Sequence, residues 1–175
     1  MLAIVGSLVP VRRPTLALRT ALSVRGAVAL VVGGGPLEGS LKRLAAELSA
    51  RDRVVFAGRV AHDRIPLFFR AADLSIHTPK FEGFGLSILE SMAAGTPPAA
   101  TPVGAIPDLV SDRETGVFIP EDPARAGEVI GELLSDRETL REMGERCVSV
   151  ATSRSWLDVA EALLRAYREG CCSGG

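Results

Sequence analysis

The chain has 175 residues, of which 47% are hydrophobic, and its 20 basic and 21 acidic side chains give a net charge of −1. This length and composition favour a globular protein that can bury a core, and they argue against a disordered chain. Without a basic bias, and with aromatic residues at only 5%, the sequence also argues against a nucleic-acid-binding surface.

In the first half of the chain, short apolar runs alternate with longer amphipathic stretches. The short runs have the length and the unbroken apolar character of strands buried on both faces. The predicted strands lie at 2–5, 27–32, 54–57 and 74–77. The predicted helices lie at 15–24, with Pro14 in the first turn, at 37–50, and from Asp63, as a cap, to about residue 71.

The second half continues the alternation with shorter strands. A helix is predicted at 85–94, followed by a short strand at 97–100 that two prolines weaken. A short helix at 104–110 and a small last strand at 116–119 follow. Residues 123–169 have helical patterning, with breaks near Ser135 and Thr152.

This order of elements predicts an α/β fold: a Rossmann-like, doubly wound parallel sheet with helices on both faces. We expect one domain over residues 1–170. Ligands of such sheets bind at the carboxyl ends of the strands. The loops that follow the predicted strands should therefore line one rim; they lie at 6–13, 33–36, 58–62, 78–85 and 101–107.

The sequence also points to a reduced, cytoplasmic protein without a metal site. No apolar run approaches the roughly 20 residues that span a bilayer. Residues 2–11 lack the basic start and the cleavage site of a signal peptide, so we interpret them as containing a buried strand. The three cysteines, Cys147, Cys171 and Cys172, have no disulfide or metal-binding spacing. We expect residues 171–175 to form a disordered tail.

The strongest chemical signal is a pair of glutamates around a glycine-rich loop. Glu82 precedes Gly83 and Gly85, and Glu90 lies in the helix that follows, about 8 Å along its axis. The helix start offers unpaired N–H groups and partial positive charge. A ligand with hydroxyls at both ends and phosphate between them, such as a sugar nucleotide, suits this pattern.

Other interpretations of the two glutamates stay open. Each is also compatible with an ordinary solvated acid. A glycosidase carboxylate pair is a further option, which the loop and the helix terminus disfavour because they suit an anion.

Several residues in the other rim loops could bind phosphate. The turn at 33–36 could do so, although Glu38 stands where a dinucleotide-binding fingerprint would have its third glycine, and a tight turn alone also explains it. Within this turn, Gly34 is a weak candidate. Arg12, Arg13 and Arg59 could donate forked hydrogen bonds to phosphate or be surface charges. His77, at the end of a buried strand, is better explained as a structural histidine than as a base, and the case for His62 is weak.

Taken in order, these segments resemble the C-terminal, nucleotide-sugar-binding domain of the family 4 retaining glycosyltransferases, which have the GT-B fold. The Glu82–Glu90 spacing matches the family's Glu-x7-Glu motif. The resemblance covers nearly the whole chain, and its segments are 3–10, 30–37, 53–60, 70–73, 82–90, 94–97, 104–107, 115–117, and Ser155, Trp156 and Tyr167.

The resemblance implies a role for each matched site residue. Glu82 would contact the donor sugar, and the loop from Gly83 through Phe84, Gly85 and Leu86 would meet sugar or phosphate through its amides. Glu90 would bind the ribose, and Arg59 and Val60 would lie by the nucleobase. The donor would be a UDP-, GDP- or ADP-sugar, and a hexosyl group would be transferred with retention, without an essential metal or further cofactor.

The chain departs from the family pattern at the phosphate-binding positions. Ser7 replaces the usual arginine, Arg12 stands at the companion lysine position, and Arg13 replaces the following glycine. Thr78-Pro79 stands where the family often has Pro-Ser, and Pro98 where it has a small aliphatic residue.

The resemblance also implies a missing partner. Met1 directly precedes the first strand of the family's second domain, and the family's N-terminal domain holds the acceptor. We therefore expect a donor-binding domain that needs an acceptor domain or a separate acceptor subunit, which could hold an acceptor at a membrane surface. The alternative is a non-catalytic nucleotide-sugar-binding or regulatory module, either a fragment or a degenerate paralogue. A sugar-nucleotide epimerase is a weaker alternative.

Overall fold

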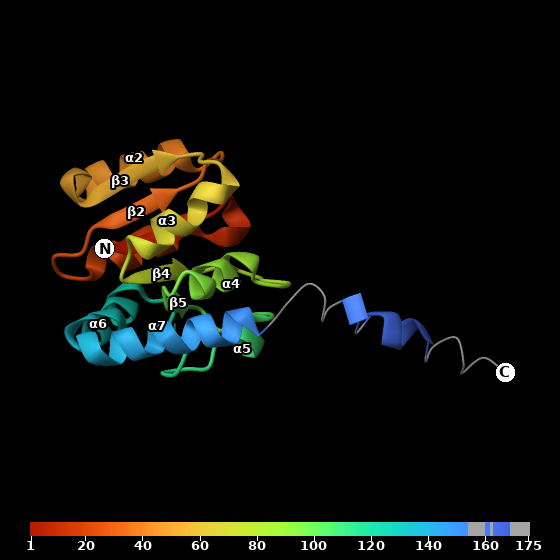
Figure 1. Ribbon diagram of the computed structural model, residues 1–175. Helices are drawn as coiled ribbons and strands as arrows, with labels where there is room; N and C mark the ends of the chain where they lie inside the picture. The colour runs from red at the N-terminus through yellow and green to blue at the C-terminus, as the bar shows by residue number, and fades with distance from the viewer. Residues whose placement is uncertain (154–159, 162, 169–175) are drawn as a thin grey trace.

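Six parallel strands form one sheet in the order β3-β2-β1-β4-β5-β6 (Figure 1). The structure is a computed structural model that describes residues 1–153, 160–161 and 163–168. All the strand pairs in this sheet are parallel, as predicted. The strands are β1 (Leu2–Val5), β2 (Ala29–Val32), β3 (Val54–Gly58), β4 (Leu74–His77), β5 (Pro98–Ala100) and β6 (Val117–Phe118).

The helices lie where the periodicity predicts them, although several of their ends differ by one to three residues. The helices are α1 (Pro14–Ser23), α2 (Glu38–Glu47), α3 (Ile65–Arg70), α4 (Leu86–Ala93), α5 (Ile106–Leu109), α6 (Pro123–Ser135) and α7 (Arg137–Thr152). The prediction of Asp63 as a helix cap is wrong, because Asp63 lies inside a 3₁₀ turn and α3 begins at Ile65. Helix α2 ends at Glu47, before the predicted end, and the chain then turns through Ser49 at φ +51°.

Helices cover both faces of the sheet, which confirms the doubly wound fold. In β1, Leu2 and Ile4 belong to the core that β1 forms with α1, α2 and α6. Their neighbours Ala3 and Val5 point to the opposite face and pack with Phe69 of α3. Side chains on successive strand positions point to opposite faces, so an unbroken apolar strand is what a sheet covered on both sides requires.

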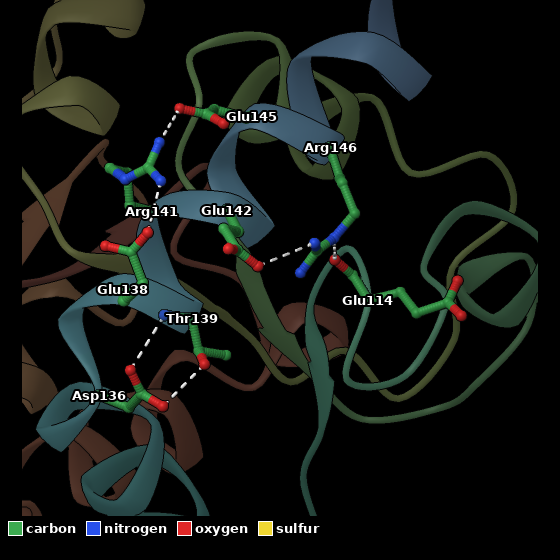
Figure 2. A network of polar contacts seen from close by, with 8 residues as sticks. All are labelled: Glu114, Asp136, Glu138, Thr139, Arg141, Glu142, Glu145 and Arg146. Atoms are coloured by element: carbon green, nitrogen blue, oxygen red, sulfur yellow. Dashed lines mark hydrogen bonds and ion pairs between the residues drawn. The ribbon is translucent and has the colours of Figure 1, made fainter.

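Helix α7 packs closely against α4, and its outer face carries ion pairs between residues of the helix itself. Gly144 of α7 lies so near the carbonyl oxygen of Gly95 that a Cβ atom at position 144 would be 2.6 Å from it. Figure 2 shows the exposed face, where Arg141 joins Glu138 and Glu145. Asp136 caps the helix by accepting a hydrogen bond from the Thr139 amide at 3.0 Å. This bond, with that of the Thr139 hydroxyl, holds the pKa of the Asp136 carboxyl below its usual range.

The strand order reverses between β1 and β4, which makes this the topological switch point of the sheet. The two strands pair at Leu2–Leu74 and Ala3–Ser75. Their carboxyl ends, which include Val5 and His77, line a cavity.

Some of the sequence expectations concern residues near or outside the described ranges. Ser155, Trp156 and the tail 171–175 lie outside the described residues, whereas Tyr167 is described and is 70% exposed. Within the described part of the chain, no helix combines the length and apolar character that crossing a membrane requires.

Candidate functional site

The cavity at the switch point brings together loops from distant parts of the chain. Gly6, Ser7 and Arg12 come from the loop after β1, and Thr78 and Glu82 come from the loop after β4. Parallel strands place these loops at one edge of the sheet, as the sequence predicts. The candidate site is therefore assembled by the fold rather than by neighbouring residues in the sequence.

Glu82 is anchored at the start of α4. Its Oε1 atom accepts hydrogen bonds from the amides of Gly85 at 2.9 Å and Phe84 at 3.3 Å. A carboxylate is favourable there because the first N–H groups of a helix carry partial positive charge. Two of the amides that the resemblance assigns to a ligand thus point at Glu82 itself. Gly83 and Leu86, from the same loop and helix start, are exposed.

The main chain of the loop after β5 contacts the main chain of Glu82. The amide of Ala105 donates to the carbonyl oxygen of Glu82 at 2.9 Å. Gly104 adopts φ +56°, and a Cβ atom there would lie 2.0 Å from the same oxygen. Only glycine fits this position without moving Glu82. The sequence motif contained this glycine, but its contact with Glu82 could not be inferred from it.

Of the cations in the loop after β1, Arg12 is the one directed at Glu82 and α4. Its Nη1 atom lies 3.5 Å from Glu82 Oε2 and donates to Ser87 Oγ at 3.3 Å. The Arg12 side chain is 40% exposed, so the guanidinium keeps access to solvent. Ser7, which lines the same cavity, is exposed.

Arg13 takes a different position from its neighbour. All three nitrogens of its guanidinium have protein partners: Nε donates to the Thr78 carbonyl at 2.8 Å, Nη2 to the Pro79 carbonyl at 3.0 Å, and Nη1 pairs with Glu121 at 2.8 Å. These contacts direct Arg13 to other loops rather than to a ligand, which the sequence analysis did not anticipate.

Glu90 lies farther along α4, beside the loop that follows β3. The Nε2 atom of His62, from that loop, is 3.7 Å from Glu90 Oε1. Glu90 is 30% exposed and His62 is 82% exposed, so both can reach a ligand at the rim. No partner for His62 could be inferred from the sequence, because only the fold brings this loop beside α4.

The glycine turn after β2 packs against the loops on either side of it. A Cβ atom at Gly33 would lie 1.9 Å from the carbonyl oxygen of Gly6, and a Cβ atom at Gly34 would lie 2.8 Å from Arg59 Cγ. Close packing is thus sufficient to explain glycine at Gly33. Arg59 is exposed next to Gly34, whereas Val60 packs partly against the α3 side of the core.

A chain of buried polar groups runs behind the cavity from His77 to α4. His77 Nε2 is 2.9 Å from Ser75 Oγ, Ser75 Oγ is 2.7 Å from Ser91 Oγ, and Ser91 Oγ is 2.6 Å from the Thr96 carbonyl oxygen. A carbonyl only accepts, so Ser91 donates to Thr96 and Ser75 donates to Ser91. His77 must then donate to Ser75, which places a proton on Nε2.

Burial keeps this imidazole neutral. His77 is 7% exposed. Burial, and after it the positive charge of Arg12, lower its pKa to about 3. This geometry agrees with the interpretation of His77 as a structural histidine.

The site therefore combines a cation, a helix start and two carboxylates along one rim. Arg12 and the start of α4 favour an anion, and Glu82 and Glu90 can accept hydrogen bonds from hydroxyls. This combination suits a ligand that carries both phosphate and sugar groups.

Comparison with protein families supports the resemblance seen in the sequence. The family model described as "Glycosyl transferases group 1" matches residues 1–148. D-inositol 3-phosphate glycosyltransferase of Nocardia farcinica is 35% identical over 179 residues, and the match covers 95% of this chain and 40% of that protein. The chain thus spans about two fifths of the length of this curated relative.

Solved structures show the same fold over nearly the whole chain. Sucrose-phosphate synthase from Thermosynechococcus elongatus aligns with a TM-score of 0.87 at 25% identity, covering 99% of this chain and 46% of that one. Anabaena Alr3699/HepE in complex with UDP aligns with a TM-score of 0.86 at 21% identity, covering 96% of this chain and 48% of that one.

Proposed function

Because the chain belongs to the group 1 glycosyl transferases, we propose that its switch-point cavity binds a nucleotide diphosphate sugar as the donor for glycosyl transfer. The observation that carries the proposal is the meeting of Arg12, Glu82 and the start of α4 at this cavity. A cation and a helix start suit the diphosphate, and the carboxylate suits sugar hydroxyls.

We assign the two ends of the donor to the two glutamates. Glu82 accepts hydrogen bonds from the transferred sugar and Glu90 from the ribose, while Arg59, with Gly34 and Val60, borders the nucleobase. Arg12 and the α4 start stabilise the negative charge that develops on the leaving diphosphate, which is electrostatic catalysis. The exposure of Glu90 and Arg59 at the rim supports this assignment.

The donor nucleotide that we propose is uridine diphosphate, with GDP- and ADP-sugars as the alternatives. The support is the UDP complex of Alr3699/HepE, whose fold matches this chain. We propose that transfer proceeds with retention and that the acceptor is held by an N-terminal domain or a separate subunit. Relatives that are more than twice as long as the matched segment support the second point.

Calorimetric titration of the 175-residue chain with UDP-, GDP- and ADP-glucose tests donor binding. We expect one of the three to bind, and Glu90→Ala to weaken that binding by about 10- to 100-fold, because a charged acceptor for the ribose is lost. Glu128→Ala, at an exposed position of α6, is the matched control and should leave the affinity unchanged. Failure of all three donors to bind would reject the proposal.

A second candidate function is a binding module without catalysis, and Ser7 is the observation that favours it. A serine carries no charge to neutralise a diphosphate, although Arg12 lies nearby. Ser7→Arg discriminates between the two. A gain in donor affinity of about tenfold or more would indicate an impaired site, whereas unchanged affinity would indicate that Arg12 already supplies the charge.

A further inference from the structure

Hydrogen bonds join the loops after β1 and β4 beside the cavity. The amide of Lys80 donates to the Val11 carbonyl at 2.7 Å, and the Thr78 hydroxyl donates to the Arg13 carbonyl at 3.1 Å. The Arg13 side chain adds bonds to the carbonyls of Thr78 and Pro79. In β1, only Leu2 and Ala3 pair with β4, so these bonds extend the contact between the two segments into the loops that follow the strands.

Arg13 reaches a third loop as well. Its Nη1 atom pairs with Glu121, which lies after β6 at the far edge of the sheet. One side chain thus fixes the loops after β1, β4 and β6 relative to one another. The Arg13 side chain is 23% exposed, which is low for a surface arginine and consistent with this packing.

The backbone of Arg13 shows that the position is constrained. Arg13 has φ +47° and ψ +51°, a left-handed backbone conformation that residues other than glycine rarely adopt. The residue also forms the boundary between the 3₁₀ turn at 10–12 and α1. Such a conformation persists when surrounding contacts hold it in place, and the three guanidinium contacts do so here.

The two adjacent arginines have different partners. Arg12 contacts Glu82 and Ser87 at the cavity, whereas Arg13 contacts the segment that leads into Glu82. We propose that Arg13 is a positioning residue for donor binding: it does not touch the donor, but clamps three loops so that Arg12 and Glu82 face the donor in the right geometry. This inference rests on the proposed donor-binding function.

Titration with UDP at two salt concentrations, together with thermal unfolding, tests the clamp. We expect Arg13→Ala to weaken UDP binding about tenfold, because Arg12 and Glu82 are then no longer held in the geometry that faces the donor. The salt dependence of binding should stay as in the unmodified chain, because Arg13 does not contact the donor and the charge of Arg12 remains at the cavity. Arg12→Ala should both weaken binding and reduce the salt dependence. Arg19→Ala, an exposed charge on α1, is the control and should change neither.

The variant Glu121→Gln distinguishes a geometric role of the Arg13 clamp from a purely electrostatic one, because the two roles predict opposite changes in UDP affinity. Removing a negative charge near an anion site should strengthen UDP binding if electrostatics alone operates. If Glu121 anchors the Arg13 clamp, the same change should weaken binding, and it should have no further effect in the Arg13→Ala background. Tighter binding by Glu121→Gln would overturn the proposal.

The remaining outcomes also decide between the hypotheses. Arg13→Ala with UDP affinity within twofold of the unmodified chain, or with the reduced salt dependence of Arg12→Ala, would overturn the clamp and leave donor binding intact. Hydrogen exchange at the Lys80 amide should become faster in Arg13→Ala, and unchanged exchange would also contradict the clamp. If the unmodified chain binds no nucleotide, the donor site and the role of the clamp in it are both rejected.

Discussion

At the scale of single residues, several positions of the site are held by the main chain rather than by side chains. Gly104 is the clearest example, because its left-handed backbone and its approach to the Glu82 carbonyl leave no room for a Cβ atom. The glycine therefore contributes to the site through the residue it supports.

We predict that Gly104→Ala destabilises the protein by at least about 2 kcal/mol, from backbone strain and the clash with Glu82. Donor affinity should fall as well, because Glu82 must move. Gly26→Ala is the matched control: it has φ +73° but nothing within 4 Å of a Cβ atom, so it should cost only about 1 kcal/mol. Urea denaturation measures both, and equal losses in the two variants would contradict the prediction.

His77 predicts a pH dependence of stability. Its pKa is lowered from 6.5 to about 3 in the folded protein by burial and by Arg12. Below pH 6.5 the unfolded chain takes up a proton on this histidine and the folded chain does not, so acidification favours unfolding. The free energy of unfolding should therefore decrease as the pH falls, and its slope should approach about 1.4 kcal/mol per pH unit near pH 5.

The comparison of His77→Gln with the unmodified chain isolates this effect. Glutamine keeps an N–H donor for Ser75 Oγ but does not titrate. Urea denaturation between pH 7 and pH 5, above the range of most carboxylates, should show a flatter pH dependence in the variant. The same slope in both chains would assign the effect to other groups.

At the scale of elements, the contact of α7 with α4 depends on glycine. Gly144 lets the backbone of α7 approach the end of α4 at Gly95. We predict that Gly144→Ala destabilises the protein by about 1–3 kcal/mol, because the clash outweighs the better helix propensity of alanine.

Gly131 provides the opposite case within α6. Nothing lies within 4 Å of a Cβ atom at this position. Gly131→Ala should therefore stabilise the protein by about 0.5–1 kcal/mol through helix propensity alone. Chemical denaturation of the two variants should give opposite signs, and stabilisation by both would show that α7 can shift without loss.

The strands and most helices could be predicted because their signals are local. Apolar runs such as 27–32 and the proline at the start of α1 require no knowledge of the fold. The start of α3 could not be predicted in the same way, because the stretch around Asp63 is compatible with either a capped helix or a 3₁₀ turn. Likewise, the left-handed turn at Ser49 has no glycine to mark it.

At the scale of the whole molecule, a ligand that binds the folded chain should stabilise it. We predict that UDP at a hundred times its Kd raises the free energy of unfolding by about 2.7 kcal/mol. Thermal unfolding with and without UDP measures this gain. The Glu90→Ala chain at the same UDP concentration should gain less, and an equal gain would place UDP away from Glu90.

The site could be predicted only as far as the order of the loops allowed. Parallel strands place the loop of Arg12 and the loop of Glu82 at one edge, and the sequence was sufficient for that inference. The bond from Gly85 to Glu82 and the three contacts of Arg13 were not predictable, because they depend on how loops from distant strands pack.

The reversal of strand order has a mechanical consequence. It divides the chain into two halves of three strands each, joined in the sheet by the short pairing of β1 with β4. On one face α1 also packs on α6, where Ser23 bonds to Pro123. The cavity lies where these two halves meet. A ligand that spans the cavity would contact the loops of both halves, so we expect the force needed to separate the halves to rise with UDP occupancy.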